Sequence, residues 1–269
     1  MDLDIYQVDS FTNEAFKGNP AGVCITKDGL SEQLMLLIAE EMAVSETAFL
    51  SLDDMKLRWF TPKAEVKLCG HGTLATAHVL KERGQLNKGD SVHFETLSGT
   101  LTANINESTI ELDFPSPVIN FDVIPPTELL KFLGIEKDNI ISFGNFDSKV
   151  FIEIDSEKAL LNLQPNFDAL KQITGRGVLI TTRSTDERLD FISRYFAPWV
   201  GVNEDPVTGS AHCALTIYWS EKLNKLKLKG FQASSRGGYI DTELQPNGRI
   251  KLIGSAITVI KGIMQVPVV

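Results

Sequence analysis

Apolar and polar residues alternate in short runs along most of the chain, and this period of two is typical of half-buried β-strands. In the first half the runs cover residues 3–8, 21–25, 46–52, 56–60, 91–95, 101–105 and 109–114. In the second half they cover residues 150–154, 177–182, 189–196, 226–232, 249–253 and 256–260. We therefore expect a protein in which β-sheets predominate.

Helical patterns are fewer. The clearest covers residues 32–42, where Leu34, Ile38 and Met42 share one face and Ser31 can cap the first turn. Further helices are expected at residues 73–83, 126–133, 167–174 and 211–223. Many strands with a few separated helices indicate an α+β protein with mostly antiparallel or mixed sheets. A doubly wound parallel sheet is disfavoured because strands and helices do not alternate regularly.

A proline-rich segment just before the middle of the chain is the best candidate for a domain boundary. The segment contains Pro115, Pro117, Pro125 and Pro126. Proline interrupts both helices and sheet ladders, which is typical of a linker. We expect an N-terminal half at residues 1–115, joined by the final strand at about 258–269, and a C-terminal half at residues 118–257.

Two similar segments, at residues 68–75 and 207–214, suggest that the chain contains an internal duplication. Each has a small residue, a glycine, a polar residue and then an apolar helix that contains alanine. Their glycines, Gly70 and Gly209, are 209 − 70 = 139 residues apart, about half of the chain. The pattern predicts two similar halves with a glycine turn at a helix N-terminus in each, although any helix start can contain a glycine.

Composition narrows the class of protein but does not identify a ligand. The 269 residues are 43 % hydrophobic and 23 % charged, as in ordinary globular proteins. A net charge of −9 argues against nucleic acid as a partner. The sequence has no apolar run long enough for a membrane span and an acidic start unlike a signal peptide. Its three cysteines form no metal or disulfide pattern, so a cytoplasmic location is expected.

The two glycine turns are candidate anion sites. Helix N-termini expose unpaired N–H groups and a partial positive charge, which suit a small carboxylate substrate. Gly70, Gly72 and Gly209 would permit backbone with positive φ and a close approach to a ligand. Two such helix ends facing each other would hold one anion between the halves. The alternative is that these glycines only begin helices.

Glu46 is the most informative single residue. On a strand at residues 46–52 it would share one face with Ala48 and Leu50, so its carboxyl would lie at the end of an apolar face. Burial there would raise the pKa of Glu46 toward the range useful for proton transfer. The alternative is a strand-end glutamate that points into water.

Other polar residues near the turns have both a functional and an ordinary interpretation. His71 would be kept neutral by the helix end, or would be a surface histidine. Asp205 and Ser210 could act at a site, or could be a cap and a first-turn serine. His71 and His78 lack carboxylate neighbours in sequence, so no metal site is expected. Nucleophile-elbow, zinc-protease and P-loop motifs are also missing from the sequence.

Several of these segments together resemble the PhzF-like family of phenazine-biosynthesis isomerases. In order they are VDSFT and GNPAGV at residues 8–12 and 18–23, SETAF at 45–49, RWFTP and EVKLCGHGT at 58–62 and 65–73, and YFAP and NEDPVTGSAH at 195–198 and 203–212. The resemblance implies the diaminopimelate-epimerase-like fold, with two similar α+β halves that each wrap a sheet around a central helix. It also implies an active site in the cleft between the halves, no metal or organic cofactor, and a homodimer.

The resemblance further implies roles for single residues. Glu46 would be the catalytic acid/base, His71 and Asp205 would assist it, and Asn19 would line the site. Substrate would be held at the two turns by Gly70, Gly72, Thr73, Gly209 and Ser210. In the phenazine enzyme such a site isomerises a dihydro-hydroxyanthranilate by relaying a proton between ring carbons.

Two further functions remain open at this point. Related epimerases and racemases use one cysteine at each glycine turn, but here Cys69 is matched by Thr208, whose hydroxyl is far too weakly acidic to replace a thiol. A two-thiol racemase is therefore disfavoured, and Cys69 is interpreted as a small buried residue. An epimerase that uses Glu46 or Cys69 with another partner remains an alternative. So does a non-catalytic binding module.

Overall fold

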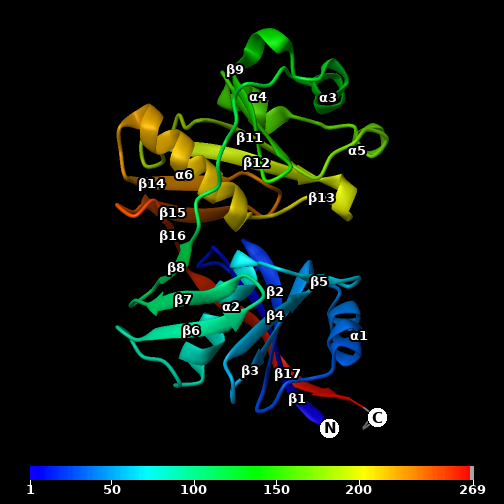
Figure 1. Ribbon diagram of the computed structural model, residues 1–269, viewed down its shortest axis with the longest axis vertical. Helices are drawn as coiled ribbons and strands as arrows, with labels where there is room; N and C mark the ends of the chain where they lie inside the picture. Colours follow the sequence, from blue (N-terminus) through cyan, green and yellow to red (C-terminus); the bar gives the residue numbers. More distant parts are fainter. Residues whose placement is uncertain (267–269) are drawn as a thin grey trace. The chain divides into compact units, whose positions relative to one another are not determined.

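The computed structural model describes residues 1–266, and the chain forms two compact units (Figure 1). The first unit contains Met1–Phe114 and, of the described chain, residues 251–266, and the second contains Pro115–Ile250. The chain re-enters the first unit at Lys251 because β16 pairs with β8. The sequence-based division placed this return near residue 258, and residues 267–269 of its final strand lie outside the described part.

The first unit is a mixed sheet. Its strands are β1 (Asp2–Ser10), β2 (Asn19–Thr26), β3 (Glu46–Ser51), β4 (Lys56–Phe60), β5 (Glu65–Val66), β6 (Ser91–Thr96), β7 (Gly99–Ile105), β8 (Ile110–Phe114), β16 (Ile250–Gly254) and β17 (Ala256–Gln265). Pairing runs β17–β1–β2–β3–β4–β6–β7–β8, with β5 beside β4. The β2–β3 and β4–β6 pairs are parallel and are connected through α1 (Glu32–Met42) and α2 (Gly70–Glu82).

The second unit repeats this plan. Its strands are β9 (Ile140–Phe146), β10 (Lys149–Ile154), β11 (Val178–Arg183), β12 (Phe191–Ala197), β13 (Val202–Glu204), β14 (Lys227–Gln232) and β15 (Gly238–Leu244). Pairing runs β9–β10–β11–β12–β14–β15, with β13 beside β12. The helices are α3 (Thr127–Leu133), α4 (Glu157–Asn162), α5 (Phe167–Leu170) and α6 (Gly209–Leu223), with short 3₁₀ segments at Lys137–Asn139 and Pro198–Val200.

The order of pairing is the same in both units. In each, an antiparallel hairpin is followed by a parallel, an antiparallel, a parallel and an antiparallel pair. In each, a short strand precedes a long helix that begins at a glycine, Gly70 in α2 and Gly209 in α6. The two similar halves expected from the sequence are therefore confirmed.

Each long helix is enclosed by its own sheet. Helix α2 contacts β1, β2, β3, β7, β8 and β17, and its Leu74, Ala77 and Val79 are fully buried. In the second unit the side chains of β12 alternate between two cores. Ile192 and Phe196 lie in the core with α3, α4 and α5, whereas Phe191 and Tyr195 face α6. The predicted α+β fold, with a sheet around a central helix in each half, is confirmed.

Four strands and one α-helix were not expected from the sequence, nor were the two 3₁₀ segments. Strands β5 and β13 have two and three residues, which is too short for a period to be visible. Strands β9 and β15 contain glycine and exposed apolar side chains, Ile141 and Tyr239, and α4 has only six residues. Predicted helix 167–174 ends early, at Leu170. Among residues 1–266, no helix combines the length and apolar character needed to cross a membrane.

Candidate active site

The first glycine turn is the beginning of α2 itself. The helix begins at Gly70, three residues before the predicted start, and Cys69 is its N-cap, with Sγ accepting the Gly72 N–H at 3.3 Å. Neither Gly70, Gly72 nor Gly209 has a positive φ, so that expectation was wrong. Gly72 is needed for space, because a Cβ there would lie 2.9 Å from the Trp59 Cδ1 and 3.0 Å from the Cys69 Sγ.

His71 lies at the centre of a cluster of polar side chains. Its Nε2 lies 3.3 Å from Glu46 Oε2 and 3.4 Å from Ser45 Oγ. Its Nδ1 lies 3.5 Å from Asn19 Nδ2 and 3.6 Å from Cys69 Sγ. The His71 side chain is 8 % exposed and that of Glu46 is 22 % exposed, so a ligand can reach the carboxylate but hardly the ring. Glu46 therefore does not simply point into water.

The charges in this cluster differ from those expected. Burial raises the pKa of the Glu46 carboxyl. The hydrogen bond and the positive charge of His71 lower this pKa by more than burial raises it, so the resulting pKa lies below the usual value. Burial lowers the pKa of His71, but Cys69 and Glu46 raise it well above its usual value. The expected raised pKa of Glu46 and neutral His71 were both wrong, because the two groups meet and form an ion pair.

The same side chains bear on whether a metal ion could bind. One ligand atom each of Glu46, Cys69 and His71 lies within 4.8 Å of the others, and carboxylate, thiolate and imidazole suit zinc. A metal ion would have to displace the proton that the raised pKa of His71 keeps on the imidazole, because a protonated imidazole has no free lone pair. Burial also raises the pKa of the Cys69 thiol, which disfavours the thiolate. We therefore describe the cluster as an ion pair beside a thiol.

Other residues hold the backbone of the first turn by hydrogen bonds. Ser10 donates its hydroxyl to the His71 carbonyl at 2.8 Å, which fixes the backbone that carries the imidazole. The hydroxyl and the N–H of Thr73 both donate to the Cys69 carbonyl, at 2.7 and 3.1 Å. Thr73, predicted to hold substrate, thus gives both of its donors to the turn. Asn19 is fully buried at the start of β2.

The second turn, at the beginning of α6, is built differently. Its N-cap Thr208 makes no side-chain cap: its hydroxyl donates to the Asp205 carboxylate and accepts from Gln232 Nε2 at 3.3 Å. Gln232, fully buried on β14, accepts the Thr208 N–H at 2.9 Å and donates to the Asp205 carbonyl at 2.6 Å. Asp205 is also held by its N–H, which donates to the Tyr195 carbonyl at 3.0 Å. These bonds fix the segment between β13 and α6.

Two more side chains complete the second cluster. The Ser210 hydroxyl accepts from Lys149 Nζ at 3.1 Å. The ring of His212 is fully buried, and its Nδ1 lies 2.9 Å from the Thr208 carbonyl, the partner expected of an Nδ1–H donor. Burial lowers the pKa of His212 to about 4, so this histidine is neutral and structural.

The predicted site residues thus fall into two groups. Those brought together around His71 are Asn19, Glu46, Gly70, Gly72 and Thr73, all in the first unit, and those at the second turn are Asp205, Gly209 and Ser210. Sequence reasoning gave no role to Ser45, Gln232 or Lys149. Ser45 could have been chosen as a candidate because it precedes Glu46 in the sequence. Gln232 and Lys149 could not, because they lie on strands far from the two turns along the chain.

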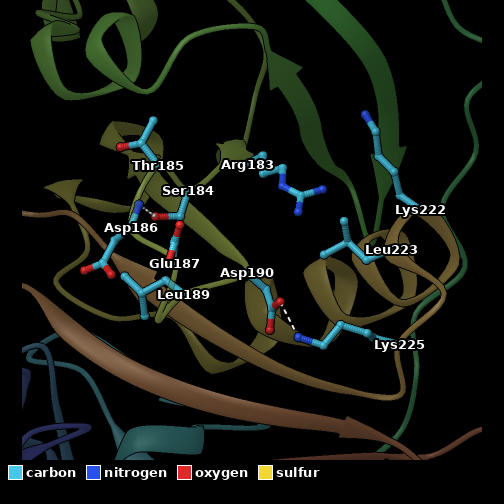
Figure 2. A pocket seen from close by; sticks show the side chains of 10 residues that line it. All are labelled: Arg183, Ser184, Thr185, Asp186, Glu187, Leu189, Asp190, Lys222, Leu223 and Lys225. Atoms are coloured by element: carbon cyan, nitrogen blue, oxygen red, sulfur yellow. Dashed lines mark hydrogen bonds and ion pairs between the residues drawn. The ribbon is translucent and has the colours of Figure 1, made fainter.

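The second unit has a cavity of about 510 Å³ whose lining includes no residue of either cluster (Figure 2). It is lined by the loop after β11 and by the C-terminal end of α6, roughly 20 Å along that helix from Ser210. Two of its three cations are already paired, Lys222 with Glu153 and Lys225 with Asp190. It is therefore not part of the candidate active site.

Comparisons with known proteins agree on one family. The model of the family described as "Phenazine biosynthesis-like protein" (PhzC-PhzF) matches residues 8–262. A curated protein from Halalkalibacterium halodurans, named an uncharacterized isomerase, is 50 % identical over 97 % of this chain and 98 % of its own length. The crystal structure of a PhzF-family protein from Enterococcus faecalis has a TM-score of 0.91 and 37 % identity, and covers 99 % of this chain and 100 % of that one.

More distant structures share the fold alone. A probable proline racemase from Agrobacterium radiobacter has a TM-score of 0.62 at 15 % identity, with 98 % of this chain and 93 % of that chain covered. At this identity the likeness carries no residue roles. It does support the epimerase-like architecture expected from the sequence.

Proposed function

The chain belongs to the phenazine biosynthesis-like (PhzC-PhzF) family, and on this basis we propose that it is an isomerase that moves a proton between carbon atoms of a small carboxylate substrate without a cofactor. Glu46 is assigned as the acid/base, assisted by His71 and Asp205. Asn19, Gly70, Gly72, Thr73, Gly209 and Ser210 are assigned to binding or shaping the substrate site. The isomerase name of the 50 % identical relative supports this class of reaction.

The observation that carries the proposal is the Glu46–His71 pair. A catalytic carboxylate must be ionised, accessible and held in one orientation. Glu46 meets these needs because its Oε2 lies 3.3 Å from His71 Nε2 and its side chain remains 22 % exposed. Ser45 also hydrogen-bonds to the Glu46 carboxylate and lowers its pKa. Before substrate binds, Glu46 is therefore a base ready to accept a proton.

The pair also supplies a way to return the proton. A carboxylate with a lowered pKa binds a proton weakly, so a protonated Glu46 beside His71 gives it up readily at a second carbon. The positive imidazole stabilises negative charge that develops on the substrate when the first proton leaves. One carboxyl group can therefore serve both steps, and no redox or metal chemistry is needed to balance the reaction.

The second turn contributes binding in this proposal. The first N–H groups of α6 have no acceptor inside the helix, and Thr208 does not cap them. These groups and the Ser210 hydroxyl suit a substrate carboxylate. Asp205 is placed beside them by Gln232 and Tyr195. A crystal structure with bound substrate tests whether these groups and Glu46 contact the same molecule.

An epimerase that uses two thiols is less well supported. Thr208 stands where a second cysteine would be needed, and its hydroxyl donates to Asp205. Burial raises the pKa of the remaining thiol, Cys69. A non-catalytic binding module would have no need for an ionised, accessible Glu46 held against a buried histidine.

We also propose a cytoplasmic homodimer, which cell fractionation and light scattering would test.

The test is a screen of small carboxylates in deuterium oxide. We expect at least one compound to change the position of a double bond and to acquire deuterium at the new C–H position. Deuterium at the original stereocentre with inversion, and without double-bond movement, would favour an epimerase. If every compound that binds remains free of deuterium and unchanged after long incubation, the enzyme proposal is wrong and the binding module is favoured.

A further inference from the structure

We propose that Lys149, a residue outside every motif of the sequence, supplies the positive charge that receives the substrate carboxylate at the beginning of α6. The inference rests on the proposed function, because it names the group that recognises the substrate class. It goes beyond that function by assigning a binding residue in β10 and by separating the carboxylate subsite from the proton-transfer group, Glu46.

The fold places Lys149 next to the second turn. It is the first residue of β10, directly after a two-residue hairpin in which Asp147 and Ser148 have φ of 44° and 63°. Its Nζ donates to the Ser210 hydroxyl at 3.1 Å and lies 5.1 Å from the centre of the Phe146 ring. The ammonium group is therefore fixed beside the first turn of α6 by a hydrogen bond and an aromatic face.

The charge of Lys149 is compensated only in part, by Asp147, which lies close enough to raise the pKa of Lys149. The residue is partly buried, yet among residues 1–266 its amino group forms no ion pair. Other lysines around α6 are paired, as in Lys222 with Glu153 and Lys225 with Asp190. Burying an ammonium group without an ion-pair partner costs free energy, and a bound carboxylate would reduce that cost.

The pKa of Lys149 is lowered in the absence of a ligand, chiefly by burial. Burial lowers the pKa of Lys149, Asp147 raises it and Arg176 lowers it. Asp147 offsets part of the positive charge at this place, and the second cation, Arg176, adds to it. A carboxylate bound at Lys149 would stabilise its charged form in return.

The beginning of α6 adds donors at the same place. The Thr208 hydroxyl donates to Asp205 and accepts from Gln232, and the first N–H groups of α6 have no side-chain cap. The beginning of α2 differs, because the Cys69 sulfur caps Gly72 and the Glu46 carboxylate lies beside His71. Each turn has a carboxylate, Glu46 at the first and Asp205 at the second, but among residues 1–266 only the second has a lysine ammonium without an ion pair, Lys149. The carboxylate subsite is therefore assigned to the second turn.

The experiment uses two matched pairs of probes, acetate with acetamide and benzoate with benzamide. Binding to the full chain is measured by NMR titration of the backbone amides of residues 209–211. Loss of a charge-assisted hydrogen bond predicts that Lys149→Met weakens carboxylate binding by about tenfold or more and changes amide binding little. Lys149→Arg should keep most of the affinity. Lys171→Met, which removes an exposed lysine of the same unit, should bind as wild type.

Two results would overturn the inference. One is a folded Lys149→Met variant that binds both carboxylates with the wild-type Kd, and the other is a wild-type chain that binds neither more tightly than its amide. The outcome is separable from the isomerase proposal. Substrate turnover with an unchanged KM in Lys149→Met would refute the role of Lys149 alone. Lysine-dependent carboxylate binding without proton exchange in any compound would refute the isomerase alone.

Discussion

Replacing Glu46 by glutamine separates the proton-transfer role of this side chain from its structural role. Glutamine keeps the size of the side chain, and its Oε1 can still accept a hydrogen bond from His71 Nε2, which lies 3.3 Å from Glu46 Oε2. It cannot accept a proton from carbon and return it. A positioned acid/base contributes roughly 10²–10⁴-fold, so kcat should fall by at least about 10²-fold, or roughly 3 kcal/mol in barrier height.

The structural cost of the same change should be small. The ion pair becomes a neutral hydrogen bond, and His71 can release its proton, so we expect a loss of about 1–2 kcal/mol in the free energy of unfolding. For a chain of this length that lowers Tm by a few degrees, about 2–4 °C per kcal/mol. The pKa of His71, now raised in part by Glu46, should fall, and an NMR titration of the imidazole measures that shift directly.

The assay is turnover and solvent deuterium incorporation on the carboxylate found in the screen, with Kd measured separately. Glu41→Gln is the matched control, because Glu41 is exposed on the same unit and should retain wild-type activity. Binding by Glu46→Gln should stay near wild type while kcat falls. A folded Glu46→Gln variant with kcat within about tenfold of wild type would refute the assignment.

Three further predictions concern the same cluster. Because the folded-state pKa of Glu46 lies below its ordinary 4.5, its contribution to stability is present above pH 4.5 and is lost as pH falls through the folded value. The stabilisation that accompanies the raised pKa of His71 is fully present below its ordinary pKa of 6.5 and is lost as pH rises through the folded-state pKa. The Tm difference between wild type and Glu46→Gln should therefore be largest between pH 4.5 and 6.5. EDTA should leave turnover unchanged, and a loss restored by a divalent cation would contradict the cofactor-free mechanism. Cys69→Ser should retain turnover because serine can still cap Gly72, whereas Cys69→Met should lower Tm through overpacking against Gly72. A Cys69→Ser variant that is folded but inactive would restore a role for the thiol.

Much of the local structure was readable from the sequence. The helix capped by Ser31 has the predicted bounds of 32–42, and its cap bond to Leu34 is present. Strand β4 likewise covers the predicted residues 56–60. The repeated glycine pattern indicated two similar halves, and both contain the same order of strand pairs. Periodicity and caps were predictable because they depend on residues that are close together in the chain, and the repeat was visible because two distant segments have the same local pattern.

The ionisation of the site was decided only by tertiary structure. Glu46 and His71 are 25 residues apart, and their pKa directions depend on a contact that no local pattern reveals. Lys149 and Ser210 are 61 residues apart and meet because β10 begins beside the first turn of α6. Sequence pattern determines which face a side chain occupies, but packing determines which charge it meets there. Because a pKa follows burial and neighbouring charge, the candidate acid/base could be named from the sequence, while its charge state and the Lys149 cation required the fold.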